Sequence, residues 1–357
     1  MEIHQVLVRA LPANAVTKDA LALRPLLRRF GPSEVFSFHR PDPGVPDVAP
    51  LAAYERRPAH PSGETVLLLH SWFDHAGVVR FLEGRPERVL LRYHGGARPE
   101  QFERFDPRFA RTLRAAREEI RGLRHRVDGV LTASRHNADE LRGLGFERVA
   151  VVPPVEDMTA LTAEPAGDGG ALPAMDGPVV TFVGRLAPNK AHELLIQAFH
   201  VLKTYLCPTA HLVLAGERRF HAVYRLALER YVAELALPDV HFTGPLTNTA
   251  LADLYRRSDV FLCMSRYEGF CVPLVEAMAF GVPVVAWGVT AVGETVGDAG
   301  IVLDEPRPAL AAEAVARVLA DGALRARLRA RAEARLREFD AAAVGRRMVA
   351  SIEAVLG

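Results

Sequence analysis

Apolar residues come in short runs along the first half of the chain, separated by longer stretches in which apolar positions recur every three or four residues. Short runs favour strands, and the recurring spacing favours amphipathic helices. Strands are predicted at residues 3–11, 33–38, 64–71, 88–96, 128–134 and 148–155, with helices at residues 19–31 and 136–145. Because most runs are continuously apolar, they are typical of a parallel sheet covered on both faces.

A second strand–helix series follows a stretch that lacks any period. Residues from about 156 to 177 are rich in Gly, Pro and Ala, which predicts a linker. Strands are then predicted at residues 178–184, 210–216, 240–244, 259–265, 283–288 and 300–304, with helices at 190–205, 222–237, 248–258, 273–281, 309–321, 323–339 and 341–356. The pattern predicts an α/β fold of two doubly wound, Rossmann-like domains with an interdomain cleft. The expected boundaries are an N-terminal domain at 1–160, a linker at 161–177, a C-terminal domain at 178–340 and a closing helix at 341–357.

Composition narrows the class of protein. A chain of 357 residues suits two domains, and 49% hydrophobic with 24% charged residues is typical of a packed globular protein. A net charge of +1 excludes a nucleic-acid polycation. Three cysteines argue against a disulfide framework or a zinc ribbon, and we expect no metal site. The N-terminus lacks a basic segment followed by a long apolar core, so we expect no signal peptide and a cytoplasmic location.

In doubly wound sheets, ligands bind at the carboxyl ends of the strands, and two such ends carry candidate chemistry. The segment "GRLAPNK", residues 184–190, follows a predicted strand and precedes a helix. Gly184 permits a tight turn, and Arg185 and Lys190 supply two cations beside a helix N-terminus. That combination suits a diphosphate, although a solvated charged turn is the alternative for so short a motif.

The segment "YEGFCVPLVEAM", residues 267–278, follows another predicted strand. Its Gly269, Phe270 and Cys271 offer successive backbone N–H groups, which can form an anion-binding nest. The carboxylates of Glu268 and Glu276 suit the hydroxyls of sugars, since a carboxylate accepts paired hydrogen bonds. The spacing of the two glutamates alone carries no information; its value comes from the strand end, the glycine and the proline that begins the next helix.

Together these segments resemble a known family. "VGRLAPNKAHELLIQAF", "LVLAGE" and "VHFTGPLTNTALADLYRRSDVFLCMSRYEGFCVPLVEAMAFGVPVVA" are similar, in order and in spacing, to the donor half of the family 4 glycosyltransferases. These are retaining enzymes of the two-domain GT-B fold. The resemblance covers residues 179–303, and residues 1–150 are similar in layout to bacterial members. It further implies that the helix at 341–356 crosses back to the first domain.

The resemblance implies a role for each matching residue. Arg185 and Lys190, after Gly184, would hold the donor diphosphate and neutralise the leaving group in place of a metal. Glu268, with the backbone of residues 269–271, would hold the transferred sugar, and Glu276 would bind the donor ribose. His94 matches a histidine that the family places near the reacting centre. One departure stands at Ala13 and Asn14, where the family has a glycine that approaches the donor phosphates.

Two features of the first half concern the acceptor. His70 ends a predicted strand, and with Trp72 and Asp74 in "HSWFDH" it forms a candidate acceptor pocket. The stretch "RTLRAAREEIRGLRHR" places five arginines on one helical face, at positions 111, 114, 117, 121 and 124. A solvated surface helix is the simple interpretation. Docking to an anionic membrane surface is the alternative, favoured by the excess of basic residues in residues 1–150.

The expected function is metal-independent, cofactor-free transfer of a hexose from a UDP- or GDP-sugar to a hydroxyl, in glycan, glycolipid or glycosylated-metabolite synthesis. One alternative is another enzyme on the same fold, such as a nucleotide-sugar epimerase; a phosphorylase would need a Schiff-base lysine, and the chain has three lysines in all. A second alternative is a nucleotide-sugar-binding protein without transfer activity, prompted by the departure at Ala13. Turnover of a donor separates these hypotheses.

Overall fold

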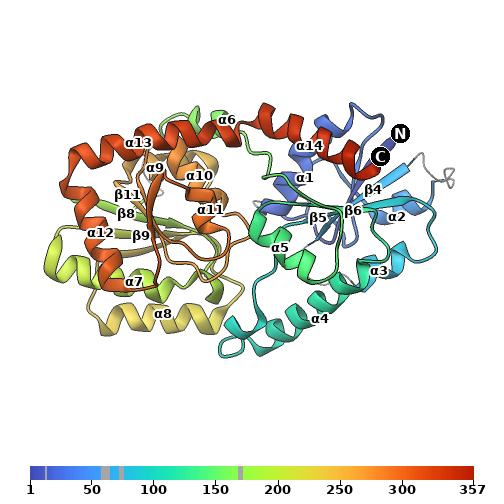
Figure 1. The fold of residues 1–357 in the computed structure, drawn as a ribbon. Helices are drawn as coiled ribbons and strands as arrows, with labels where there is room; N and C mark the ends of the chain where they lie inside the picture. The colour runs from blue at the N-terminus through green and yellow to red at the C-terminus, as the bar shows by residue number, and fades with distance from the viewer. Residues whose placement is uncertain (13, 58–64, 72–75, 168–171) are drawn as a thin grey trace. The chain divides into compact units, whose positions relative to one another are not determined.

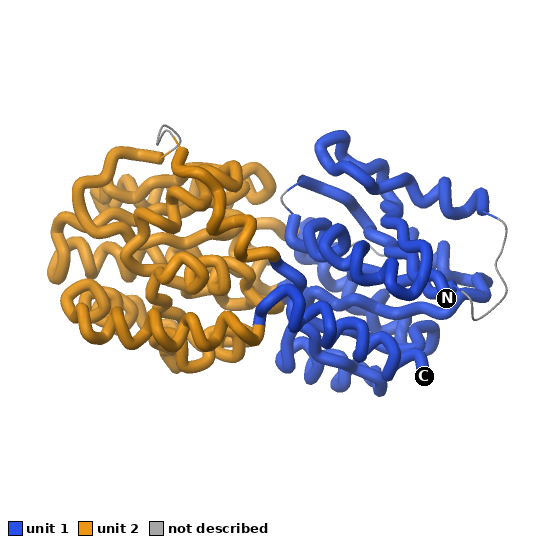
Figure 2. The backbone as a smooth tube through the Cα atoms, turned by 90° about the horizontal axis from the view of Figure 1, so that it is seen from above, with its two compact units in different colours: residues 1–99, 108–156, 339–357 blue, residues 100–107, 157–338 orange. Residues whose placement is uncertain are grey.

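The computed structural model describes residues 1–12, 14–57, 65–71, 76–167 and 172–357. Two compact units make up the chain. The first comprises residues 1–99, 108–156 and 339–357, and the second comprises residues 100–107 and 157–338; Figure 2 colours them separately. The segment 100–107 therefore belongs with the second unit although it lies within the first half of the sequence, which the hydrophobic pattern does not predict.

The first unit is built on a parallel sheet of seven strands in the order β3-β2-β1-β4-β5-β6-β7. The strands are β1 (Glu2–Leu7), β2 (Val35–Ser37), β3 (Val48–Pro50), β4 (Thr65–Ser71), β5 (Arg88–Tyr93), β6 (Gly129–Thr132) and β7 (Val149–Val151). The helices are α1 (Ala15–Leu27), α2 (Leu51–Glu55), α3 (Ala76–Leu82), α4 (Pro107–Leu123), α5 (Arg135–Gly143) and α14 (Ala341–Leu356), with a 3-10 turn η1 (Pro99–Gln101).

Both faces of this sheet are buried, as the continuous apolar runs predict. In β4, Val66 and Leu68 pack on one face with α1 and α14, whereas Leu67 and Leu69 pack on the other with α4 and α5. Helices α1 and α14 lie side by side although they are far apart in sequence (Figure 1). The last helix of the chain is therefore part of the core of the first unit.

The second unit contains a parallel sheet of six strands in the order β10-β9-β8-β11-β12-β13. The strands are β8 (Val179–Val183), β9 (His211–Ala215), β10 (Val240–Gly244), β11 (Val260–Cys263), β12 (Val284–Trp287) and β13 (Gly300–Leu303). The helices are α6 (Met158–Thr162), α7 (His192–Val201), α8 (Ala222–Glu234), α9 (Asn248–Arg257), α10 (Val272–Ala279), α11 (Val292–Val296), α12 (Pro308–Ala320) and α13 (Gly322–Leu336); the short turns are η2 (Pro188–Lys190), η3 (Leu202–Leu206) and η4 (Arg337–Phe339).

The predicted fold class, two doubly wound parallel α/β sheets, is confirmed. The elements that the pattern omits are short: β3, α2, α3, α6 and α11 have three to seven residues. Such segments hold at most two turns of helix or one pair of alternating positions, which is too little to show a period.

Candidate functional site

Two loops of the second unit meet at the carboxyl ends of neighbouring strands. Strand β8 leads into residues 184–190 and β11 leads into residues 264–271, and the two strands pair in parallel. The carbonyl oxygen of Asn189 accepts hydrogen bonds from the backbone N–H groups of Arg266 (2.8 Å) and Tyr267 (3.3 Å). The Asn189 side chain donates in return to the carbonyl oxygen of Tyr267 (3.3 Å). Asn189 therefore joins the two motifs that the sequence places about 80 residues apart.

A lysine–glutamate ion pair lies at the centre of this junction. Lys190 Nζ is 2.6 Å from Glu268 Oε2, and the side chains are 18% and 6% exposed. Ser265 Oγ donates to the other carboxylate oxygen of Glu268 at 2.8 Å. Burial alone would lower the pKa of Lys190, but the charge of Glu268, its hydrogen bond and the nearby Cys271 together raise the pKa above its usual value. The two side chains expected to contact the donor are thus held by one another.

Arg185 differs from Lys190 in being exposed. It makes no hydrogen bond or ion pair with any residue that the structure describes, so its guanidinium is available to an anion. The backbone beside it is tightly packed, because a Cβ at Gly216 would come within 2.2 Å of the carbonyl oxygen of Gly184. Gly216 has φ +146° and no side chain, which allows the ends of β8 and β9 to approach this closely.

The loop after Glu268 contains one left-handed residue and is held by two threonines. Cys271 lies in the left-handed region at φ 74° and is the N-cap of α10. A left-handed residue next to right-handed ones turns successive N–H groups toward one side. Two threonines hold the loop: Thr290 Oγ1 accepts from the backbone N–H of Glu268 (3.0 Å), and Thr295 Oγ1 donates to the carbonyl oxygen of Phe270 (2.6 Å).

Glu276 is oriented by a buried tyrosine. Tyr255 of α9 has no exposed surface, and its hydroxyl donates to Glu276 Oε2 at 2.7 Å. Burial, and after it the charge of Glu276, raise the pKa of Tyr255 well above its usual value, so the hydroxyl keeps its proton and remains a donor. The carboxylate is therefore kept in one orientation within α10, beside the loop that begins at Glu268.

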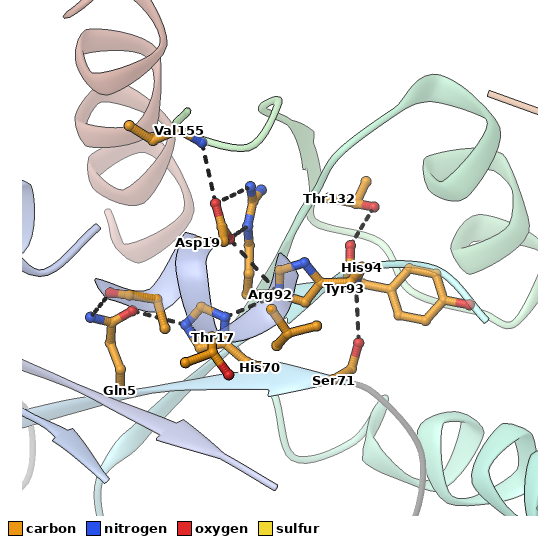
Figure 3. A network of polar contacts seen from close by, with 12 residues as sticks. Gln5, Thr17, Asp19, His70, Ser71, Arg92, Tyr93, His94, Thr132 and Val155 are labelled. Carbon is orange, nitrogen blue, oxygen red and sulfur yellow. Dashed lines mark hydrogen bonds and ion pairs between the residues drawn. The ribbon is translucent and has the colours of Figure 1, made fainter. Parts of the chain in front are cut away.

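The remaining predicted site residues belong to the first unit. His94 follows β5 and is 12% exposed, whereas His70 in β4 is fully buried, with its two ring nitrogens 2.9 Å from Gln5 Oε1 and 3.0 Å from His94 Nε2 (Figure 3). His70 thus lies inside the unit and not on a surface that an acceptor reaches. Asn14 is the N-cap of α1 and accepts from the N–H groups of Val16 and Thr17. Ala13, Trp72 and Asp74 lie outside the described residues.

Three groups of side chains in the described part of the chain have the composition of metal ligands. They are Asp19, His70 and His94; His211, Asp239 and His241; and Cys263, Glu268 and Cys271. The carboxylate of each group already carries a protein cation: Arg92 on Asp19 (2.8 Å), Lys203 on Asp239 (2.6 Å) and Lys190 on Glu268 (2.6 Å). A metal ion would have to displace that cation, so we assign none. Among the described helices, none has both the length and the apolarity needed to cross a bilayer.

Several residues of the site were not singled out by the motifs. Gln5 and Arg92 are polar residues inside apolar strand runs and are fully buried. That position is itself a signal, because a polar side chain in a strand covered on both faces needs a specific partner. Asn189, Ser265 and Tyr255 carry no comparable signal, since their partners lie on other elements.

The comparisons with known proteins agree with this geometry. Residues 170–335 match the family described as glycosyl transferases group 1. The D-inositol 3-phosphate glycosyltransferase of Xylanimonas cellulosilytica is 31% identical over 226 residues, which are 59% of this chain and 53% of that protein. The chain thus spans about half the length of this curated relative.

Solved structures show the same fold across the whole chain. The sucrose-phosphate synthase of Thermosynechococcus elongatus matches with a TM-score of 0.78 at 20% identity and 99% coverage of both chains. Anabaena HepE in complex with UDP-glucose matches with a TM-score of 0.76 at 19% identity, over 99% of this chain and 100% of that one. Residues 170–335 are therefore similar to the group 1 glycosyl transferases, and the chain has the fold of these solved structures.

Proposed function

We propose that this chain transfers a hexose, with retention of anomeric configuration, from a UDP- or GDP-sugar to an acceptor hydroxyl bound by residues 1–150. The observation that carries the proposal is the group of Arg185, Lys190, Glu268 and Glu276 at the strand ends of the second unit. It unites an available cation, a buried ion pair and an oriented carboxylate within the segment that matches the family. The complex of HepE with UDP-glucose supports a nucleotide-sugar donor.

The proposed roles are compatible with the observed ion pair. The ammonium of Lys190 has three N–H donors, and Glu268 takes one, so others remain for phosphate oxygens. Arg185 supplies a second cation, and the two together stabilise charge on the departing diphosphate. Glu268 keeps one oxygen on Ser265 while it holds the transferred sugar with the backbone of residues 269–271. Glu276 accepts from the ribose hydroxyls while Tyr255 holds its other side.

The test is a ligand screen followed by turnover. Thermal shifts with UDP, GDP, ADP and their common sugars should single out one nucleotide, because binding to the folded state raises apparent stability by mass action. Glu276→Ala should weaken nucleotide binding, and Glu268→Ala should mainly lower the rate of sugar transfer or donor hydrolysis. Glu313→Ala, at an exposed position of α12, is the matched control. Equal and negligible effects of the first two changes would refute the assignment.

Two rival functions have their own outcomes in the same experiment. Tight nucleotide binding with no turnover of any donor would favour a binding protein, the alternative prompted by Ala13 and Asn14. Conversion of one nucleotide sugar into another, without an acceptor, would favour an epimerase. Release of free nucleotide together with a glycosylated acceptor, or with the free sugar, supports the transferase.

We further propose that α4 docks on an anionic membrane surface as a peripheral contact of a cytoplasmic enzyme. The arginines at positions 111, 114, 117 and 121 of α4, and Arg124 directly after it, are exposed, although Arg117 and Arg121 also form ion pairs with Glu140 and Glu118. The opposite face is used internally, since Ile120 and Leu123 belong to the core of the first unit. Attachment would thus be electrostatic, worth about 1 kcal/mol per arginine near the surface and weakened by salt.

Co-sedimentation with vesicles tests this contact. The protein should bind phosphatidylserine-containing vesicles at low salt and should not bind neutral vesicles. The double variant Arg111→Glu/Arg121→Glu should lose binding, whereas Arg327→Glu/Arg337→Glu, at exposed positions of the second unit, should retain it. Absence of binding at low salt, or equal loss with both variants, would remove the membrane contact and leave the transferase proposal unaffected.

A further inference from the structure

A row of hydrogen-bonded polar groups leads from the carbonyl group of Ala20 in α1 through Gln5 and His70 to His94. Gln5 Nε2 lies 2.8 Å from the carbonyl oxygen of Ala20, Gln5 Oε1 lies 2.9 Å from His70 Nε2, and His70 Nδ1 lies 3.0 Å from His94 Nε2. Gln5 and His70 have no exposed surface. The two imidazole rings are nearly parallel, with centroids 5.3 Å apart. Figure 3 shows this row beside Asp19 and Arg92.

The direction of every hydrogen bond in this row follows from its first member. A backbone carbonyl only accepts, so the atom of Gln5 that faces Ala20 is the NH2 group and the atom that faces His70 is the oxygen. An amide oxygen also only accepts, so His70 Nε2 carries the proton. Burial, with the charge of His94, holds the pKa of His70 well below its usual value, so this ring is neutral and its Nδ1 is an acceptor. The bond between the two rings therefore requires a proton on His94 Nε2.

The bond to His70 uses one ring nitrogen of His94, Nε2, and leaves Nδ1 for a ligand. Burial lowers the pKa of His94 to about 4, against the opposing effect of Asp19, so the ring is neutral at pH 7. A neutral imidazole with its proton on Nε2 has an unprotonated Nδ1. That atom makes no hydrogen bond to any residue in the described part of the chain. Its position is secured by the backbone, since the N–H of His94 donates to Ser71 Oγ (3.4 Å) and the carbonyl oxygen of Tyr93 accepts from Thr132 Oγ1 (2.9 Å).

Asp19 does not accept a hydrogen bond from the Nε2–H group of His94. Its nearer oxygen is 3.8 Å from His94 Nε2, beyond hydrogen-bond distance, whereas Arg92 donates to the carboxylate at 2.8 Å and 3.3 Å. The guanidinium also donates to the carbonyl oxygens of Val152 and Pro153. The carboxylate is committed to Arg92, so His70 is the hydrogen-bond partner that determines the tautomer of His94.

We infer that His70 and Gln5 are positioning residues, which hold His94 in the Nε2–H tautomer so that its Nδ1 accepts a hydrogen bond from a hydroxyl of the bound substrate. This inference rests on the proposed transferase function for the identity of the hydroxyl, which belongs to the sugar or its acceptor. The tautomer itself is a property of the protein without ligand. With the proton on Nδ1 instead, the ring would donate, so the substrate hydroxyl would have to accept and could no longer give its hydrogen to the ring.

The test reads the tautomer directly. Protein labelled with 15N in its histidines gives separate ring-nitrogen signals, and His94→Asn identifies those of His94 among the 13 histidines of the chain. We expect a protonated, pyrrole-type signal for His94 Nε2 and an unprotonated, pyridine-type signal for Nδ1 at pH 7. The opposite assignment, or equal mixing of the two forms, would overturn the inference without any activity measurement.

Variants then connect the tautomer to turnover. In His70→Leu, His94 should no longer be held in one tautomer, and kcat should fall about 10- to 100-fold, by analogy with the loss of a partner that orients a metal-binding histidine. His70→Gln keeps an acceptor for His94 and a donor for Gln5, so it should restore both the signal and most of kcat. Gln5→Leu is a second, milder route to the same loss if His70→Leu folds poorly. His4→Leu, a buried histidine next to Gln5 on β1, is the control and should change neither.

The outcomes separate this inference from the proposed function. A fixed His94 tautomer in a protein that turns over neither UDP-glucose nor GDP-mannose would leave the hydrogen-bond row intact and count against the transferase proposal. If His70→Leu shows a mixture of the two His94 tautomers but unchanged turnover, the positioning role is overturned. The transferase proposal would stand. Equal losses in His70→Leu and His70→Gln would also contradict the inference, because both would then reflect packing alone.

Discussion

The ion pair between Lys190 and Glu268 should be energetically coupled and not merely adjacent. We consider Lys190→Met, Glu268→Gln and the double variant. The first change leaves a 6% exposed carboxylate with Ser265 as its remaining side-chain donor. Removing one partner of a fully buried pair costs about 3–5 kcal/mol. Because Lys190 is 18% exposed and water can reach its place, we expect about 2–3 kcal/mol, in line with a hydrogen bond to a charged group.

The free energy of unfolding of the double variant gives the coupling energy between the two side chains. With both charges gone, the amide of Glu268→Gln faces a methionine, and the penalty of an uncompensated carboxylate disappears. The double variant should therefore be more stable than the sum of the single effects predicts, by about 1.5–3 kcal/mol, which is the upper range for residues in direct contact. For a domain of this size each kcal/mol corresponds to a shift in melting temperature of roughly 2–4 °C.

The assay is urea unfolding followed by tryptophan fluorescence. Trp287 lies at the end of β12 in the second unit, and the chain has only one other tryptophan, Trp72. A Trp72→Phe background therefore confines the signal to the unit that holds the pair, where a two-state analysis applies to one domain. Effects that add within about 0.5 kcal/mol would show that the two groups do not interact, and the reasoning would fail.

Three further predictions follow from buried polar contacts. Arg92→Met should lower the free energy of unfolding of the first unit by about 3–5 kcal/mol in urea titrations, because it leaves the 1% exposed Asp19 without its cation; a change under 1 kcal/mol would contradict this. Burial alone would raise the pKa of Asp19, but Arg92 lowers it from 3.8 to about 2, so the pair contributes about 2 kcal/mol above pH 4 that is lost as the pH falls toward 2. Asp19→Asn, although less stable at pH 7, should lack that part of the acid dependence when unfolding is measured between pH 5 and pH 2. Tyr255→Phe should cost about 1–3 kcal/mol and weaken nucleotide binding in calorimetry, since Glu276 loses its hydroxyl donor; unchanged affinity would argue against Glu276 in the donor site.

Local patterns were sufficient for much of the fold and for the motifs of the second unit. Strand β8, which ends just before Gly184, and helix α10, which has Pro273 in its first turn, could be predicted because apolar runs, glycines and prolines act within a few residues of themselves. The prediction that Glu268 and Glu276 share one site rests on the rule that parallel strands present their carboxyl ends at one edge of the sheet.

What each side chain contacts was beyond such patterns. His70 ends an apolar run as His94 does, and the sequence places both at strand ends, yet His70 is buried and His94 is partly exposed. His70 lies within β4, whereas His94 follows the last residue of β5. The buried partner of His70 is Gln5, which is 65 residues away and is brought near by the pairing of β1 with β4. Local patterns also do not predict that residues 100–107 belong to the second unit, because that membership depends on residues far along the chain.

By itself, the sequence determined the two parallel sheets, the resemblance of the second half to a known family and the residue types at the strand ends, because these follow from short-range periodicity and from the chemistry of each motif. Only the tertiary structure decided that Lys190 is bound to Glu268, that Asn189 joins their loops, and that His70 directs a hydrogen bond of His94. These contacts join residues 24 to 78 positions apart. Their geometry is determined by strand order and register, and strand order and register follow from the burial of the whole core and not from any local segment.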